Sequence, residues 1–136
     1  MYWISIITLA LASLAASVKG SGTVTFGSSV EHISVNVSGT SGRASFEDRA
    51  AGGNFNGQID INCVSVVGNT ATLSGIVSHS NNKSLIGKEG MFRIVDNGKK
   101  TDMASIINFH DPGTSTDCNA GEFDVAPVKG DFTVQQ

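Results

Sequence analysis

The chain is poor in charge, and this shortage excludes one large class of partner. Only 15% of its 136 residues are Asp, Glu, Lys or Arg, against about a quarter in an average globular domain. The 9 basic residues are scattered and the formal net charge is −3. Nucleic-acid binding needs clustered Lys and Arg that release counterions from phosphates. We therefore expect no nucleic-acid partner.

Helical periodicity is also missing. After the first twenty or so residues, no stretch carries an apolar stripe at positions i, i+3, i+4 and i+7 without glycine interruptions. Such a stripe is the main signal of an amphipathic helix. Heptads and low-complexity tracts are absent as well, and 136 residues suit a single domain.

Long hydrophobic runs are confined to the N terminus, where residues 3–14 are mostly apolar and residues 15–20 are mostly small. This run is shorter than the ~20 apolar residues that span a bilayer, and it has the form of a secretory signal peptide. We expect residues 1–20 to be removed by a cut between Ala15 and Gly20. Residues 21–136 would then form one secreted, extracellular domain without a membrane segment.

Cysteine is scarce too, with only Cys63 and Cys118 in the chain. Two cysteines in an exported domain allow a single intramolecular pairing. Closing a loop of about 55 residues would stabilise the fold by about 4 kcal/mol. We therefore predict a Cys63–Cys118 disulfide. No CxxC or Cys/His spacing indicates a zinc site.

Two N-glycosylation sequons become relevant if the chain is exported. Asn36 and Asn82 each begin an Asn-x-Ser triplet, which is the acceptor motif for N-glycosylation. Asn82 lies in a polar stretch that favours a surface loop. The alternative is that these short motifs arise by chance in a sequence rich in Asn and Ser.

What the chain does contain is alternation of apolar and polar residues with period two. Ile33, Val35 and Val37 alternate with polar neighbours, as expected of a strand with one buried and one solvent-facing side. A second alternating run reaches Cys63 and then changes phase, because Val64 and Val66 continue the apolar positions. A β-bulge produces such a change of phase.

Turn signals divide these runs into hairpins. Gly68-Asn69 predicts a two-residue turn of type II′ or I′, and Asn97-Gly98 predicts a type I′ turn. Strands are expected on both sides of each turn, including residues 91–95 and 103–109, and two closing strands around residues 123–125 and 132–134. About eight short strands favour an all-β antiparallel barrel, since closure removes exposed edges. A β-sandwich is the alternative.

Residues 61–75 and 91–98, with Asp102 behind them, follow a recognisable order. A valine-rich strand is followed by Gly-Asn-x-Ala, a second strand and an Asp-Asn-Gly hairpin. In this the chain resembles a family of small secreted β domains common in actinobacteria, over the stretch from Cys63 to Phe109. The resemblance implies a secreted β fold and carries no catalytic residue with it.

Candidate catalytic residues are few. His110-Asp111 could supply a base and its orienting carboxylate, but no Gly-x-Ser-x-Gly nucleophile motif accompanies them, and Asp111 precedes Pro112-Gly113 as in a turn. Glu47 and Asp48 are adjacent, so on a strand they would face opposite sides. We therefore expect no catalytic site.

The sequence evidence for a metal site is equally weak. Asp96, Asn97 and Asp102 bracket the second predicted hairpin with oxygen ligands suited to calcium, although they do not match an EF-hand loop. His32, His79 and His110 would form a zinc site only if the fold gathered them. We therefore assign no metal and no cofactor, with calcium at the hairpin as a weak alternative.

The interior of the barrel is the remaining candidate site. An eight-stranded barrel is either filled by side chains or holds one small ligand, and seven phenylalanines could line it: Phe26, Phe46, Phe55, Phe92, Phe109, Phe123 and Phe132. A filled interior favours a non-catalytic structural or binding module. An open cavity would favour a small cyclase- or isomerase-type barrel enzyme, or a lipocalin-like carrier of a small apolar ligand.

Overall fold

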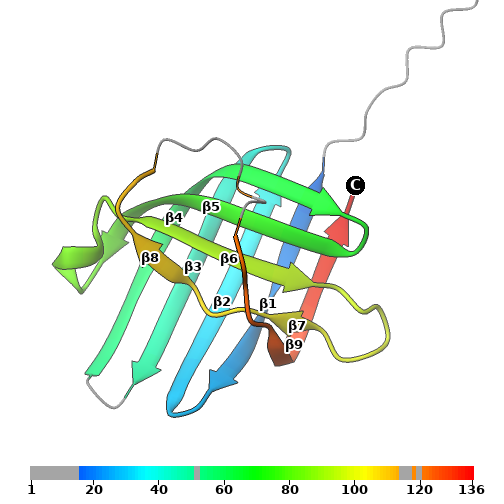
Figure 1. Cartoon of the computed structure of the whole chain (residues 1–136), viewed down its shortest axis with the longest axis horizontal. Helices are drawn as coiled ribbons and strands as arrows, with labels where there is room; N and C mark the ends of the chain where they lie inside the picture. The colour runs from blue at the N-terminus through cyan, green and yellow to red at the C-terminus, as the bar shows by residue number, and fades with distance from the viewer. Residues whose placement is uncertain (1–15, 51–52, 114–117, 119–120) are drawn as a thin grey trace, which may run out of the picture.

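A computed structural model describes residues 16–50, 53–113, 118 and 121–136, and in this part of the chain the regular structure is almost entirely β (Figure 1). Its elements are β1 (Ser17–Phe26), β2 (Ser29–Ser38), β3 (Ser41–Ala50), β4 (Gly53–Val67), β5 (Thr70–Ser80), a short 3-10 helix η1 (Lys83–Leu85), β6 (Glu89–Val95), β7 (Met103–Ala104), β8 (Asn108–His110) and β9 (Ala126–Gln135). None of the described helical segments is long and apolar enough to cross a membrane. The expected signal peptide lies mostly in residues 1–15, outside the described residues.

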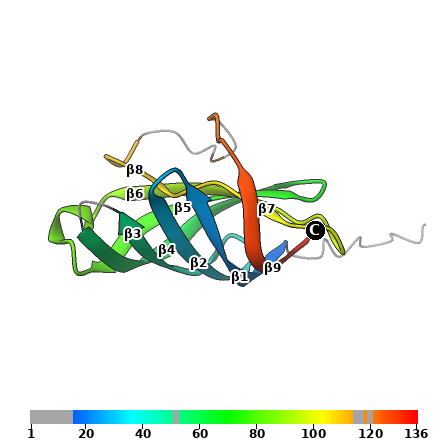
Figure 2. The same ribbon diagram turned by 90° about the horizontal axis from the view of Figure 1, so that it is seen from below.

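The strands form one antiparallel sheet that closes on itself. Their order is β5-β4-β3-β2-β1-β9-β7-β6-β8, and an additional β5–β6 pairing joins the two ends. Of the 9 strands in the described residues, β8 pairs only with β6, so the other eight form the barrel. Figures 1 and 2 show β5 and β6 lying across β1, β2 and β3. The predicted barrel is confirmed, and the sandwich alternative is not what the chain adopts.

Apolar side chains from the inner face of every long strand fill the barrel. The predicted alternation in β2 is confirmed, because Ile33, Val35 and Val37 are buried while His32 and Asn36 are exposed. The large interior side chains include Val18, Val24, Ile59, Ile61, Leu73, Val77, Ile94, Val128 and three phenylalanines, Phe46, Phe92 and Phe132. This packing accounts for the fold by burial of apolar surface.

The change of phase in β4 is a β-bulge, as predicted. The β4–β5 register shifts between Ile61 and Cys63, so the chain on either side of Asn62 presents different residues to the core. Cys63 is bonded to Cys118, with Cα atoms 5.9 Å apart, which confirms the predicted disulfide. The bond ties β4 to the chain that follows β8.

Cys118 and Phe123 lie against the outer face of β5 and β6. The Cys118 sulfur lies 3.7 Å from the Thr72 carbonyl oxygen, and the Arg93 guanidinium lies 4.7 Å from the centre of the Phe123 ring. As a result Thr72 and Ser74 are buried although they point away from the core. Phe123 therefore packs outside the barrel, and its expected place in the interior lining is wrong.

The two predicted turns differ in outcome. Gly68 has φ +61° and no described non-glycine residue has positive φ, so the first turn fits type II′ of the two alternatives. The same observation rules out type I′ at Asn97-Gly98, since that turn needs positive φ at both residues. β6 and β7 pair only at Ile94–Ala104 and Val95–Met103, and a longer loop joins them.

Two predicted strands are also corrected. The run at residues 103–109 is divided into β7 and β8, because the Ile107 N–H donates to the Glu31 carboxylate, 2.8 Å away, instead of to a neighbouring strand. Residues 123–125 form no strand, since Phe123 is held against Arg93. The second predicted closing strand is part of β9, which is longer than expected.

β1 begins before the expected domain boundary at residue 20. Val18 is fully buried and is paired with Val37 on β2 and Val134 on β9. A cut after Gly20 would divide this strand. The removal of a signal peptide itself stays a prediction.

Candidate functional site

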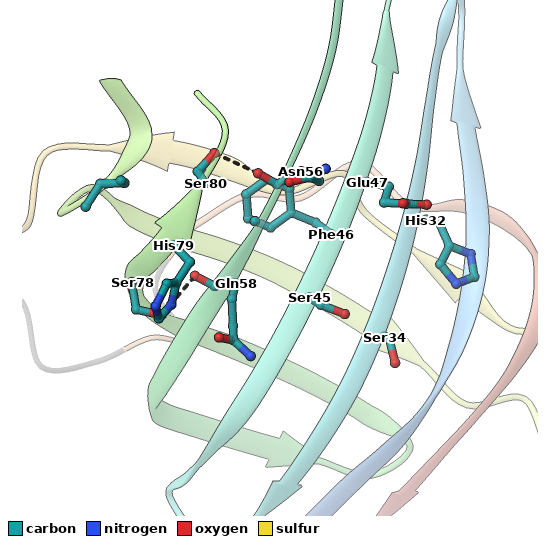
Figure 3. Close-up of a pocket in the computed structure, with 12 residues that line it drawn as sticks. His32, Ser34, Ser45, Phe46, Glu47, Asn56, Gln58, Ser78, His79 and Ser80 are labelled. Carbon is teal, nitrogen blue, oxygen red and sulfur yellow. Dashed lines mark hydrogen bonds between the residues drawn. The ribbon is translucent and has the colours of Figure 1, made fainter. Parts of the chain in front are cut away.

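A groove of about 700 Å³ crosses the outside of the barrel (Figure 3). Its walls come from β2, β3, β4 and β5 and from Ile86, just after η1. The lining residues are His32, Ser34, Ser45, Phe46, Glu47, Asn56, Gly57, Gln58, Ser78, His79, Ser80 and Ile86. Nine of the twelve lining residues have polar side chains, so hydrogen-bonding groups are available along a groove whose exposed surface is largely apolar.

Strand alternation places these polar side chains in two parallel rows. His32 is paired with Glu47 and Ser34 with Ser45, on the face opposite the buried Ile33. Both rows continue on β4, where Asn56 is paired with Glu47 and Gln58 with Ser45. Groups at paired positions on one face of a sheet lie side by side, so each row runs across the strands.

An irregularity in β5 shapes the far wall of the groove. Gln58 is paired with His79 but Ile59 with Val77, so Ser78 is an extra residue in the ladder. Such a bulge bends the strand and redirects its side chains. The Ser78 hydroxyl lies 3.2 Å from His79 Nδ1, and Figure 3 shows both side chains beside Gln58.

Gly57 lets β4 approach its neighbours closely beneath the groove. A Cβ atom at this position would lie 2.5 Å from the His79 carbonyl oxygen and 2.6 Å from Phe46 Cζ. Only glycine fits such a contact without displacing backbone. The floor of the groove is therefore built from backbone and from the edge of Phe46.

Some groove side chains are already held by the protein, and others are free to bind. His32 Nδ1 lies 2.9 Å from Thr23 Oγ1, and the Ser80 hydroxyl donates to the Asn56 carbonyl oxygen at 2.7 Å. Among the described residues, the side chains of Ser34, Ser45 and Gln58 have no hydrogen-bond partner in the protein. Their donors and acceptors face solvent.

A second hollow extends the groove toward β1. It has a volume of about 280 Å³ and is lined by Thr23, Val30, His32, Glu47 and Arg49. His32 and Glu47 belong to both hollows. Neighbouring strands are about 4.8 Å apart, so the four intervals from β1 to β5 give a track of about 19 Å.

The interior holds a polar pair that sequence reasoning missed. Glu47 and Asp48 face opposite sides, as predicted, with Glu47 in the groove and Asp48 turned inward. Asp48 is paired with Glu31 on β2, and Glu31 is only 1% exposed. The sequence did contain a signal, since Glu31 shares the odd-numbered phase of Ile33.

The candidate calcium ligands bind backbone amides instead of forming a cluster. Asp102 Oδ1 and Oδ2 accept the N–H groups of Asn97 and Phe132 at 2.9 and 2.7 Å. Asp96 Oδ1 and Oδ2 accept those of Gly98 and Val134 at 2.8 and 3.0 Å. These bonds fasten the β6–β7 loop to β9. In the described part of the chain, no three His, Cys, Asp or Glu side chains gather as a metal site would require.

The candidate catalytic pair is separated in the same way. His110 Nε2 lies 2.8 Å from Glu89 Oε1, while Asp111 forms an ion pair with Lys88. The hydrogen bond from the Lys88 ammonium lowers the pKa of Asp111. Asp111 therefore does not orient His110. His32 and His79 line the groove, but β3 and β4 lie between their strands.

The two sequons lie in different settings. Asn36 is exposed near the end of β2, between Lys19 and Arg43 on the neighbouring strands. Asn82 caps η1, and its side-chain oxygen accepts the Ser84 N–H at 3.2 Å and the Ser84 hydroxyl at 2.6 Å. Glycosylation at either residue stays a prediction.

Comparison with protein-family models, curated proteins and solved structures finds nothing that matches the chain. The resemblance to actinobacterial secreted β domains therefore stays a prediction. What the protein binds has to be inferred from the geometry of its surface.

Proposed function

We propose that this protein is a secreted, non-catalytic β-barrel module that binds an uncharged glycan in the outer groove defined above. The observation that carries this proposal is the contrast between the barrel's two faces. The inner face is packed with apolar side chains, while the outer face holds a groove with unpaired hydrogen-bonding groups. The disulfide supports an oxidising, extracellular location.

The chemistry of the groove favours a neutral ligand with many hydroxyl groups. Its walls carry four serines and two side-chain amides, with Glu47 as the one carboxylate among its lining residues. Hydroxyl and amide groups both donate and accept hydrogen bonds, as sugar hydroxyls do. A strongly charged ligand would need a cluster of opposite charge, which this lining does not supply.

The topology disfavours an extended peptide as the ligand. Peptides that add a strand to a sheet need a free edge, whereas β2, β3 and β4, which carry most of the groove, are each paired on both sides. A ligand here must be held by side chains across the strands. An oligosaccharide lying along the track of about 19 Å meets that condition.

The barrel-enzyme and carrier alternatives receive less support. Glu31 is an inward acid of the kind an enzyme could use, but it is 1% exposed, so no substrate atom can touch it. The apolar lining that a carrier would use is packed against itself.

Binding of soluble oligosaccharides tests the proposal. We expect calorimetry with cello-, chito-, xylo- and malto-oligosaccharides to detect binding of at least one. Gln58→Ala should weaken that binding about two- to tenfold, as the loss of one hydrogen bond predicts. Thr133→Ala on β9, an exposed position outside the groove lining, is the matched control. Binding of none of the four overturns the glycan assignment, and equal weakening by the control overturns the groove.

A further inference from the structure

Two acidic side chains meet inside the barrel, where the function proposed above does not use them. Glu31 on β2 and Asp48 on β3 are directly opposite each other in the register. Both lie on the inward face, in phase with Ile33 and Phe46. Two carboxyl groups at paired positions on one face of a sheet lie within contact distance.

The hydrogen bonds of this pair are incomplete. Glu31 Oε1 accepts the Ile107 N–H at 2.8 Å. Among the described residues, Glu31 Oε2 and Asp48 Oδ1 are buried and find no donor. Two ionised carboxylates offer only acceptors, so neither can satisfy the other. One proton between them supplies the missing donor and removes one of two adjacent negative charges.

In the part of the chain that the structure describes, no positively charged residue is paired with Glu31 or Asp48. The residues paired with Glu31 and Asp48 on their other sides are Val24 on β1 and Phe55 on β4. Ile107 approaches from the chain between β7 and β8. The charged neighbours in sequence, Glu47 and Arg49, line the outer hollow. In the described part of the chain, the charge that acts on Glu31 is that of Asp48.

We propose that Glu31 and Asp48 share one proton and so form a pH-dependent latch, which fastens the chain between β7 and β8 to β2 and β3 inside the barrel. With the proton in place, Glu31 bonds to both Asp48 and Ile107. Loss of the proton leaves the negative charge of buried Glu31 beside that of half-buried Asp48, which favours opening of the latch. This inference is independent of glycan binding.

The direction of the pH effect follows from linkage. Burial, and to a smaller extent the neighbouring Asp48, raises the pKa of Glu31 from 4.5 to about 8, against the lowering effect of the Ile107 hydrogen bond. The folded protein therefore holds this proton more tightly than the unfolded chain. The stabilisation is complete below pH 4.5 and is lost as the pH rises to about 8. Over that range the unfolding constant should rise about a thousandfold.

Urea unfolding of the disulfide-intact protein between pH 4.5 and 9 tests the latch. Glu31→Gln keeps an acceptor for Ile107 and places an N–H toward Asp48, as the protonated acid does. We expect this variant to lose most of the thousandfold pH dependence and to exceed the wild type in stability at pH 8. Glu47→Gln, the outward neighbour of Asp48, should retain the full dependence. A Glu31→Gln variant with the wild-type pH dependence overturns the proposal.

A second variant and a local probe keep the test decisive if Glu31→Gln does not fold. Asp48→Asn removes the like charge and donates to Glu31, so it should also reduce the pH dependence. In the wild type, hydrogen exchange at the Ile107 amide should accelerate toward pH 9 more than exchange at the Phe132 amide, which is bonded to Asp102. Equal acceleration at the two amides, with an unchanged Asp48→Asn profile, would overturn the latch.

Discussion

Replacement of Asp102 by Asn should destabilise the barrel, although it changes only one atom and the charge. Asp102 is 2% exposed, and its two oxygens accept the N–H groups of Asn97 and Phe132. An Asn side chain has one acceptor oxygen, so in either orientation its NH₂ group faces one of these N–H donors. The substitution therefore removes one hydrogen bond to a carboxylate and leaves a backbone N–H without a partner.

The expected cost follows from these two losses. A hydrogen bond to a charged group contributes about 1.5–3 kcal/mol, and an unsatisfied buried donor costs about 1–3 kcal/mol. The two contributions overlap, so we expect a loss of about 3 kcal/mol in the free energy of unfolding. For a domain of this size that corresponds to a decrease in Tm on the order of 10 °C.

Thermal and urea unfolding in EDTA measure this effect, because EDTA removes any contribution from calcium. Asp131→Asn is the matched control, since Asp131 is an exposed neighbour of Phe132 on β9. The control should stay within about 0.5 kcal/mol of the wild type. If Asp102→Asn were as stable as Asp131→Asn in EDTA, the structural role of the Asp102 carboxylate would be refuted. A wild type that is stabilised only by added calcium would favour the calcium alternative.

Two further predictions concern the covalent structure. Alkylation of the unreduced protein should modify no cysteine, and the double variant Cys63→Ser/Cys118→Ser should lose about 4 kcal/mol of stability in urea; two reactive thiols per chain would contradict this. Mass spectrometry of the exported chain should find an N terminus no later than Ser17, because β1 begins there and Val18 is fully buried. An exported chain that begins at Ser21 and is as stable as one beginning at Ser17 would contradict the assignment of residues 17–20 to the barrel.

Much of the fold could be predicted because its signals are local. Alternation at Ile33, Val35 and Val37 identified β2 and its buried face, and the change of phase after Cys63 identified the bulge in β4. Gly68 marked the first hairpin, where its positive φ is used. These features depend on residues close together in the sequence.

The features that were mispredicted depend on contacts between distant residues. Residues 103–109 were predicted to form one strand. The Ile107 N–H instead donates to the carboxylate of Glu31, 76 positions away in the sequence, and this bond interrupts the strand. Residues 123–125 read as a strand, but Phe123 packs on Arg93 outside the barrel. Period-two patterns do not show which partner a backbone group will find.

The candidate site was missed for a related reason. From the sequence alone, polar residues such as Ser34, Ser45 and Gln58 were assigned only to the solvent-facing sides of separate strands. Their alignment in one row depends on the register of β2, β3 and β4, which the sequence alone did not give. The Glu31–Asp48 pair required the same register, although the phase of Glu31 already placed it inside.

Amide chemical shifts in the presence of a bound oligosaccharide report where on the barrel the ligand sits. We expect the largest changes at the groove residues of β2–β5, such as Ser34, Ser45, Gln58 and His79. Changes concentrated at inward residues such as Ile33, Val35 and Phe92, with the groove unaffected, would place the ligand inside the barrel and contradict this expectation.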